Sequence, residues 1–441
     1  MNFEMRFLDY LFLLPGSPIL YTAGGYLVVF QLCRYLARNG HSVGILFARS
    51  RQRFIEGGAS NNKSSYSDSD IITFENLFEN SIFKIVRTAL NLPIANRTKR
   101  PSITETERIV IPKIIESFFR LCNTRFGFFW LLPILRKTIQ AENNFDMTQL
   151  NEVGLFFGTR IPSSIVAKRI IASGFTTSFL AVEYPATNLK YYLIQGYDDD
   201  PAVSGRFWKL AQDSYKLPLK KIVISKRLYA RFEDEKPILF RVGFDADFFT
   251  LTNSIRKRNN LSVVLPLLNW ETKGAIYGKS ATELLKRELP KIEIRAFGDF
   301  PTGKVPDFID YHFLPSRSTL KKLFNNCAIF VLPSVTEGFP LPPLEAMNCG
   351  CAVVTTDNGG ANEYIRNGEN GIIVPAKDSN AIKLAVIDLA SNEERRLEFA
   401  VKGMETAKKY SYDEMCRSFL TALKDWECSN LSQANGGKTR K

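Results

Sequence analysis

Two glutamates eight positions apart are the residues of this chain best suited to chemistry. Glu337 and Glu345 lie in residues 331–350, which read as an apolar strand, a Gly/Pro turn and the first turn of a helix. In open parallel sheets, ligands bind outside the carboxyl ends of the strands. Backbone N–H groups at a helix start also suit an anion such as a pyrophosphate. The segment therefore predicts one carboxylate near a reacting group, a second one deeper, and an anion-binding turn between them.

Each glutamate also has a simpler interpretation. Glu337 could be a solvated loop residue, but at the mouth of a strand it could accept hydrogen bonds from sugar hydroxyls or stabilise positive charge at an anomeric carbon. Glu345 in a first helical turn favours the helix dipole by about 0.3–1 kcal/mol, and it could in addition bind a ribose diol. Pro342 and Pro343 fit the helix start, where no N–H is lost.

Several other residues are suited to phosphate. Lys273, with Gly274, opens an expected helix, where a lysine is unfavourable for the dipole, so a charge-assisted phosphate contact of about 1.5–3 kcal/mol would explain it; the alternative is a surface lysine. Gly24 and Gly25 follow the first strand, where a side chain would block a pyrophosphate. Gly338 and the pair at 359–360 permit close backbone approach.

Metal sites and a histidine base are poorly supported by the sequence. The acidic triplet at 198–200 precedes Pro201, which is more typical of a loop and helix cap than of a metal site. His41 follows a helix C-cap and His312 lies within an expected strand, so both are predicted to be structural. The seven cysteines are scattered and lack zinc spacing, which predicts buried, reduced thiols in a cytosolic protein.

The elements that position these residues alternate as short apolar runs and amphipathic stretches, which predicts parallel βα units. In the first half, strands are expected at residues 10–14, 43–48, 153–157, 177–182, 191–195, 221–224 and 238–242, with a helix at 26–38 and a mobile loop at 57–70. After a polar linker at 250–260, strands are expected at 261–267, 292–297, 311–314, 328–332, 352–355 and 372–374, with helices at 273–287, from 342, and at 412–426.

This pattern predicts an α/β protein with two doubly wound, Rossmann-like domains facing each other across a cleft. The expected parts are an acceptor-side domain at 1–245, a nucleotide-sugar-binding domain at 246–410, a helix at 411–428 crossing back to the first domain, and a disordered tail at 429–441. With 441 residues and 45% hydrophobic content, the chain is large enough for two cores.

The net charge of +13, most of it before residue 240, narrows the classes of partner. A basic half suits nucleic acid, an anionic lipid surface or a phosphorylated substrate. No RNA-module signature or Lys/Arg run is present, so no nucleic acid is expected. No signal peptide or spanning helix is expected either, because the longest apolar run, 126–135, is too short. With Arg120, Arg125, Arg136 and Lys137, that run is a candidate face for the inner membrane leaflet, or else a core helix edge.

Taken in order, these motifs resemble the retaining glycosyltransferases of family 4 (glycosyl transferases group 1), which have the GT-B fold. The resembling segments are Gly24-Gly25 with residues 38–41, residues 241–245, Lys273-Gly274, Gly298-Asp299, Glu337 to Glu345, and 359–371. They cover nearly all of the second domain and little of the first.

The resemblance implies a role for each matching residue. Glu337 would contact the donor sugar and support its reacting centre, Glu345 would bind the ribose, and Lys273 with the Gly24 and Gly25 amides would bind the diphosphate. The other expected donor-binding residues are Gly338, Phe339, Pro340, Leu341, Asn269 and Gly298. The resemblance also implies metal-independent transfer with retention of anomeric configuration, by front-face attack in which the leaving phosphate takes the acceptor proton. No cofactor or metal is expected beyond the nucleotide-sugar co-substrate.

The sequence departs from the family in two places. The usual Arg before Lys273 is absent, because residues 267–270 are Leu-Leu-Asn-Trp, and Asn269 or another residue would have to replace it. The frequent histidine of the first domain also has no counterpart. The leading hypothesis is transfer from a UDP-, GDP- or dTDP-sugar to a glycan or lipid-linked acceptor in cell-surface polysaccharide assembly. The alternative is a catalytically silent GT-B binding or assembly partner, whereas a Rossmann dehydrogenase is disfavoured because Gly-x-Gly-x-x-Gly is missing.

Overall fold

The computed structural model describes residues 5–15, 24–48, 152–158, 160–161, 163–187, 189–197, 200, 207–268, 270–299 and 305–436. The chain divides into two compact units, Met1–Leu193 with Ser214–Leu219, and Ile194–Asp213 with Lys220–Lys441. The second unit thus includes residues 220–245, which the sequence assigned to the first domain. The domain bounds themselves stay a prediction.

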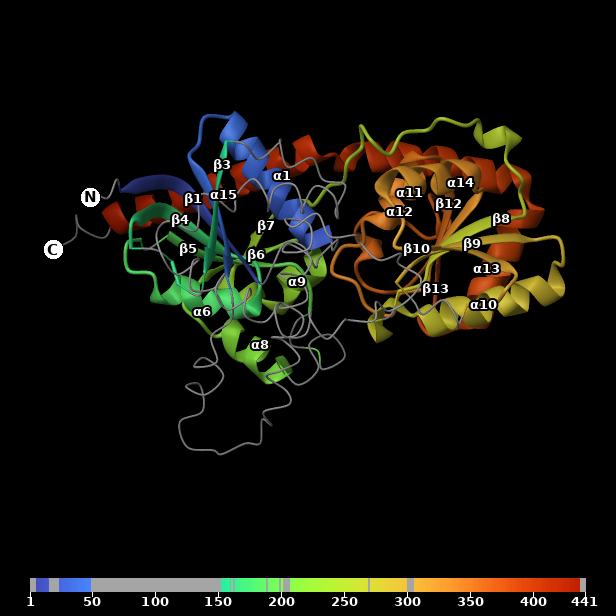
Figure 1. Cartoon of the computed structure of the whole chain (residues 1–441), viewed down its shortest axis with the longest axis horizontal. Coiled ribbons are helices and arrows are strands. Elements are labelled where there is room, and N and C mark those ends of the chain that lie inside the picture. The colour runs from blue at the N-terminus through green and yellow to red at the C-terminus, as the bar shows by residue number, and fades with distance from the viewer. Residues whose placement is uncertain are drawn as a thin grey trace, which may run out of the picture. The chain divides into compact units, whose positions relative to one another are not determined.

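The first sheet has seven strands in the order β3-β2-β1-β4-β5-β6-β7 (Figure 1). β1 pairs in parallel with both β2 and β4, and its residues Leu11, Phe12 and Leu13 are fully buried. The strands are β1 (Arg6–Pro15), β2 (Val43–Ala48), β3 (Val153–Gly158), β4 (Ile165–Ala172), β5 (Leu189–Ile194), β6 (Lys220–Val223) and β7 (Ile238–Leu239). The helices of this part are α1 (Gly24–Arg38), α6 (Phe175–Glu183), α8 (Trp208–Tyr215) and α9 (Lys226–Arg231).

Two expectations for this part of the chain are wrong. Residues 177–182 form helix α6 rather than a strand, although β-branched and aromatic residues favour strands there. The helix is started by Gly174, whose backbone N–H donates to Thr177 Oγ1 and whose carbonyl accepts from the Thr177 backbone N–H. Strand β4 was not predicted, because Lys168 and Arg169 interrupt its apolar run; in the structure the Lys168 side chain is exposed while Ile170 and Ile171 are buried.

The second sheet has six strands in the order β10-β9-β8-β11-β12-β13. Its strands are β8 (Ser262–Pro266), β9 (Glu293–Gly298), β10 (Ile309–Phe313), β11 (Ile329–Leu332), β12 (Ala352–Thr356) and β13 (Ile372–Val374). The strand order reverses direction at β8, which lies between β9 and β11. Ligands of doubly wound sheets bind at such a switch point, so the loops after β8 and β11 are the places to look for a site.

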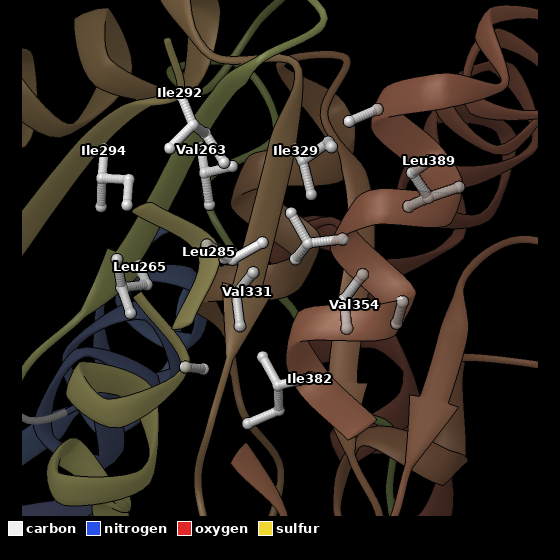
Figure 2. Packing of buried hydrophobic residues seen from close by; sticks show 14 of the residues in the cluster. Val263, Leu265, Leu285, Ile292, Ile294, Ile329, Val331, Val354, Ile382 and Leu389 are labelled. Carbon is white, nitrogen blue, oxygen red and sulfur yellow. The ribbon is translucent and has the colours of Figure 1, made fainter. Parts of the chain in front are cut away.

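Helices cover both faces of this sheet, with α10 and α13 on one face and α11, α12 and α14 on the other (Figure 1). They are α10 (Ala275–Glu288), α11 (Arg317–Asn326), α12 (Pro342–Asn348), α13 (Ser379–Ser391) and α14 (Glu393–Ala407). Figure 2 shows the apolar side chains of β8, β9, β11 and β12 packed with Leu285 of α10 and Ile382 of α13. Each such burial stabilises the unit by about 1.5–3 kcal/mol, so β8 and β11 are rigid supports for the loops that follow them.

The final helix, α15 (Tyr412–Gly436), is longer than predicted. Residues 429–435 were expected to belong to a disordered tail, but they contain no Pro or Gly, and the first helix-breaking pair is at 436–437. α15 packs on the segment after β7, where the rings of Phe419 and Phe240 lie 5.3 Å apart and the Arg241 backbone N–H donates to Ser418 Oγ.

The polar segment at 250–260, expected to be a linker, is anchored within the second unit. The Arg258 guanidinium donates to the carbonyl oxygens of Phe324 and Cys327 at 3.0 and 2.8 Å. Asn325 Oδ1 accepts from the Thr252 backbone N–H at 2.6 Å. The segment is therefore fixed to the elements around β11.

Candidate functional site

The loops after β8 and β11 bring Lys273 and Glu337 together. Lys273 is the last residue of a short 3-10 helix (Glu271–Lys273), and Glu337 follows β11 by five residues. Lys273 Nζ lies 2.8 Å from Glu337 Oε2, and Ser334 Oγ donates to Glu337 Oε1 at 2.8 Å. Only 11% of the Glu337 side chain is exposed, against 33% for Lys273. Both carboxylate oxygens are thus engaged, and the carboxylate is held in one orientation.

Backbone contacts lock these two loops to each other. The Thr272 carbonyl accepts from the backbone N–H groups of Val335 and Thr336 at 2.7 and 3.3 Å. Gly274 has φ +64°, and a Cβ there would lie 2.0 Å from the Pro333 carbonyl oxygen. Only glycine permits both the left-handed conformation and this close approach. The pairing of Lys273 with Glu337 therefore depends on Gly274.

The turn between Glu337 and α12 presents unpaired backbone donors. Within the described part of the chain, the N–H groups of Gly338, Phe339 and Leu341 donate to no acceptor. Pro342 opens α12, as predicted, and has no N–H to offer. Leu341 is buried and Gly338 and Phe339 are half-buried. Because N–H groups at a helix start lack intrahelical partners, these three neighbouring donors are available to an anion.

Aromatic side chains hold this turn in place. Tyr364 is buried and its hydroxyl donates to the Pro340 carbonyl at 2.5 Å. The Phe339 ring lies 5.3 Å from the Tyr364 ring and 5.9 Å from the Tyr410 ring. A Cβ on Gly360 would lie 2.9 Å from the Glu337 carbonyl oxygen, so the Gly359-Gly360 turn also packs on this segment.

Glu345 is half-buried on the first turn of α12, and no hydrogen bond engages its carboxylate within the described ranges. Burial raises the pKa of Glu345 from 4.5 to about 7; the positive charge of Arg317 opposes this shift and the negative charge of Asp245 adds to it. Arg317 itself pairs with Asp245, Nη2 to Oδ2 at 2.7 Å. Burial raises the pKa of the Tyr364 hydroxyl, and the negative charges of Glu337 and Glu345 add to the shift. Both carboxylates therefore act electrostatically on the same tyrosine.

We expect Glu345→Gln to remove one source of pH dependence from the free energy of unfolding. The pKa of Glu345 is higher in the folded chain than in the unfolded one, so its contribution favours the folded state below pH 4.5 and is lost as the pH rises towards 7. The difference in unfolding free energy, wild type minus variant, should fall by about 2 kcal/mol between pH 5 and pH 8. Urea unfolding of both proteins across this pH range measures it. A difference independent of pH would contradict the raised pKa.

The other predicted site residues fall into three groups. Gly24 and Gly25 are the first two residues of α1 and belong to the first unit. Gly298 ends β9 with φ +148°, and a Cβ there would lie 2.0 Å from the Leu267 carbonyl oxygen, so it supports the loop after β8. Asn269 lies outside the described residues.

Neither histidine lies at the site built by Lys273 and Glu337. His41 Nδ1 lies 3.9 Å from Asp9 Oδ2 in the first unit. His312 is on β10, with Nε2 3.3 Å from Asp310 Oδ1. Both are half-exposed rather than packed in the core.

Several expectations concern other parts of the chain. The run at 126–135, its flanking basic residues and the loop at 57–70 lie outside the described residues. None of the described helices is both long and apolar enough to cross a membrane. Within the same ranges no three His, Cys, Asp or Glu side chains are grouped as a metal site.

Burial raises the pKa of Cys327 to about 11 and that of Cys349 to about 12, so these thiols are protonated at neutral pH.

A hollow of about 480 Å³ in the first unit has none of the predicted site residues in its lining. It is lined by Ala37, Arg38, Gly40, His41, Ser42 and Glu152. These residues precede β2 and β3, so the hollow is at the amino ends of these strands. Ligands of parallel sheets bind at the opposite, carboxyl ends.

Sequence reasoning missed four residues that shape the site: Thr272, Ser334, Tyr364 and Tyr410. Ser334 precedes Glu337 by three positions, and this short spacing could have indicated a local hydrogen bond. Thr272 acts through its carbonyl oxygen, and Tyr364 and Tyr410 come from distant elements. No local sequence signal marks those contacts.

A family of known proteins matches the segment that contains Glu337 and Glu345. Residues 308–406 match the family model described as Glycosyl transferases group 1. Over this range the chain is similar to the group 1 glycosyltransferase domain. The matched range contains Glu337, Glu345 and the turn with unpaired amides, whereas Lys273 lies before it.

Similar proteins include glycosyltransferases of lipid-linked glycan and polysaccharide synthesis, and also sucrose-phosphate synthases of plants. One is the N,N'-diacetylbacillosaminyl-diphospho-undecaprenol alpha-1,3-N-acetylgalactosaminyltransferase of Campylobacter jejuni, 36% identical over 109 residues, which are 25% of this chain and 29% of that protein. Another is the amylovoran biosynthesis glycosyltransferase AmsK of Erwinia amylovora, 25% identical over 199 residues, which are 42% of this chain and 49% of that protein. The match to these relatives thus spans half or less of their length.

Solved structures extend the likeness to nearly the whole chain. Sucrose-phosphate synthase from Thermosynechococcus elongatus has a TM-score of 0.58 at 14% identity, covering 96% of this chain and 100% of that one. Anabaena HepE in complex with UDP and glucose has a TM-score of 0.57 at 14% identity, covering 95% and 99%. Together with two parallel-sheet α/β units, this likeness confirms the predicted GT-B fold class.

Proposed function

We propose that the chain is an active glycosyltransferase that moves a sugar from a nucleotide-sugar donor to a glycan or lipid-linked acceptor, with retention of anomeric configuration and without a metal. The observation that carries the proposal is the Lys273–Glu337 pair beside three unpaired backbone N–H groups. A fixed carboxylate, a cation and an anion-binding turn at a sheet's switch point are what a sugar diphosphate requires.

Each group has a role in the proposed reaction. The N–H groups of Gly338, Phe339 and Leu341, with Lys273 Nζ, would neutralise the charge that develops on the leaving diphosphate. Such preorganised donors lower the barrier because they need no reorganisation as charge develops. The Glu337 carboxylate would stabilise the positive anomeric centre, and Glu345 would accept hydrogen bonds from the ribose. A leaving phosphate oxygen would take the acceptor proton, so that the reaction needs no histidine base.

The identity of donor and acceptor is suggested by the similar proteins. Anabaena HepE is solved with UDP and glucose, which favours a UDP-sugar among the UDP, GDP and dTDP types. The Campylobacter jejuni relative is named for a diphospho-undecaprenol substrate, and AmsK for amylovoran biosynthesis. We therefore propose a lipid-linked or polysaccharide acceptor, with action at the cytoplasmic face of a membrane.

The test is nucleotide release from a panel of UDP-, GDP- and dTDP-sugars, with an undecaprenyl-diphosphate-linked sugar as acceptor. We expect one donor to be turned over, activity to persist in EDTA, and NMR of the new linkage to show the donor's anomeric configuration. Turnover of none of the donors would favour a silent binding partner. Inversion, or loss of activity in EDTA that added metal restores, would contradict the proposed mechanism.

The proposed membrane contact has a separate test. The net charge of +13 predicts attraction to anionic lipid, worth about 1 kcal/mol for each basic residue near the surface. We expect the protein to co-sediment with vesicles containing phosphatidylglycerol and not with neutral ones at physiological salt. Equal sedimentation with both kinds of vesicle would contradict an electrostatic contact.

A further inference from the structure

A guanidinium borders the turn that supports Glu337. Arg227 lies on α9, and a Cβ on Gly359 would lie 1.8 Å from Arg227 Nη1. Gly359 has φ +82°, and the next residue, Gly360, packs against the Glu337 carbonyl oxygen and against Gly338. The Gly359-Gly360 pair thus separates the Arg227 side chain from the turn with the unpaired amides, and the absence of a side chain on Gly359 is what lets Arg227 come so close.

The Arg227 side chain is able to form further hydrogen bonds and ion pairs. It is exposed, and within the described ranges it makes no hydrogen bond and no ion pair with a carboxylate. Its only partner there is the ring of Tyr197, with the Arg227 Cζ 5.3 Å from the ring centroid. A guanidinium over an aromatic face is held there by a cation–π attraction, which uses none of its N–H donors.

The surroundings of Arg227 favour an anion. Arg231, one turn further along α9, lies 6.0 Å from the same Tyr197 ring. The Tyr197 hydroxyl is buried and has no hydrogen-bond partner in the described part of the chain. The neighbouring acid, Glu363, is occupied, because its Oε1 accepts from the Lys226 backbone N–H at 2.6 Å. Two guanidiniums therefore lie at the ring of one tyrosine whose hydroxyl has no hydrogen-bond partner in the described part of the chain.

We propose that Arg227, supported by Tyr197, is a second phosphate-binding cation of the site and binds a phosphate group of one of the two substrates. The fork of an arginine matches phosphate oxygens in a bidentate manner. Residues 267–270, Leu-Leu-Asn-Trp, contain no cationic side chain, so Lys273 has no basic neighbour in that segment. This proposal rests on the proposed function for its substrates. The phosphate belongs either to the diphosphate of the donor or to a phosphorylated acceptor.

Calorimetric binding of three probes tests the proposal without activity: UDP, uridine and inorganic pyrophosphate. The variants are Arg227→Gln and Arg227→Lys, which keeps the charge but not the fork. The control is Arg287→Gln, an exposed arginine in the last turn of α10. If Arg227 binds the donor diphosphate, Arg227→Gln should weaken UDP binding about 10- to 100-fold and leave uridine unchanged. If it binds the acceptor phosphate, UDP binding is unchanged, and pyrophosphate binds to UDP-saturated wild type but not to Arg227→Gln.

Either pattern supports the proposal and identifies the source of the phosphate. Equal binding of UDP and pyrophosphate by wild type, Arg227→Gln and Arg287→Gln would overturn it, as would failure of the wild type to bind either probe. Thermal unfolding shows whether Arg227→Gln is folded, and Arg227→Lys replaces it if it is not. The proposed function fails separately, by absence of sugar turnover in a protein whose Arg227-dependent pyrophosphate binding is intact.

Discussion

Glu337→Gln should lower kcat for sugar transfer by about 10²- to 10⁴-fold while the protein stays folded. The substitution keeps the shape of the side chain and removes the negative charge that would face the anomeric centre, and electrostatic groups of this kind contribute effects of that size. Lys273 loses its charged partner, 2.8 Å away, but Ser334 can still donate to the amide oxygen. Donor binding should change far less than kcat, because the diphosphate contacts remain.

The measurement is initial rate of nucleotide release at saturating donor and acceptor, with thermal unfolding as a check on folding. A matched control is Glu369→Gln, which removes an exposed glutamate from a turn of the same unit. The control should retain wild-type kcat. A Glu337→Gln protein with a kcat within twofold of wild type would remove Glu337 from the chemistry and leave it a structural partner of Lys273.

Gly274→Ala should destabilise the second unit by about 3 kcal/mol and uncouple Lys273 from Glu337. Two costs add: a left-handed backbone for alanine, about 1 kcal/mol, and a Cβ 2.0 Å from the Pro333 carbonyl oxygen, which forces the two loops apart. Separation of the loops also breaks the hydrogen bonds to the Thr272 carbonyl. Urea unfolding measures the stability, and UDP titration measures the damage to the site.

Gly368 provides the matched control for this substitution. It too has a left-handed backbone, φ +80°, but a Cβ there would meet no atom within 4 Å. Gly368→Ala should therefore show the backbone cost alone, about 1 kcal/mol, with UDP binding unchanged. Equal losses of stability in the two variants would show that the contact with Pro333 costs nothing and that the loops after β8 and β11 are not held by Gly274.

The strands and the individual site residues of the second unit could be predicted from sequence because short sequence patterns mark them. The strand at 372–374 and the helix starting at Pro342 are found as predicted, since proline at a helix start and short apolar runs are strong patterns. Glu337 and Lys273 each follow a predicted strand, and their meeting follows from parallel topology. The pairing was nevertheless not predicted, because strand order cannot be read from one sequence.

The rest depended on contacts between distant segments. Residues 177–182 were predicted as a strand, and Thr177 and Phe179 favour strands, whereas in the structure hydrogen bonds with Gly174 start helix α6. The raised pKa of Glu345 depends on burial between α11 and α12, which no window around residue 345 could reveal. Arg227 lies more than a hundred residues before Gly359, and nothing in its own sequence neighbourhood indicates that contact.

The single carbonyl oxygen of Thr272 has a consequence for protein engineering. This oxygen accepts hydrogen bonds from the backbone N–H groups of both Val335 and Thr336. The loop bearing the lysine and the loop bearing the glutamate are therefore one connected piece of structure, although more than sixty residues separate them in the chain. A segment exchanged with a homologue at residues 308–406 would take only half of that piece. Chimaeras that exchange the whole of β8 to α12 should keep donor turnover, and those cut between the two loops should lose it.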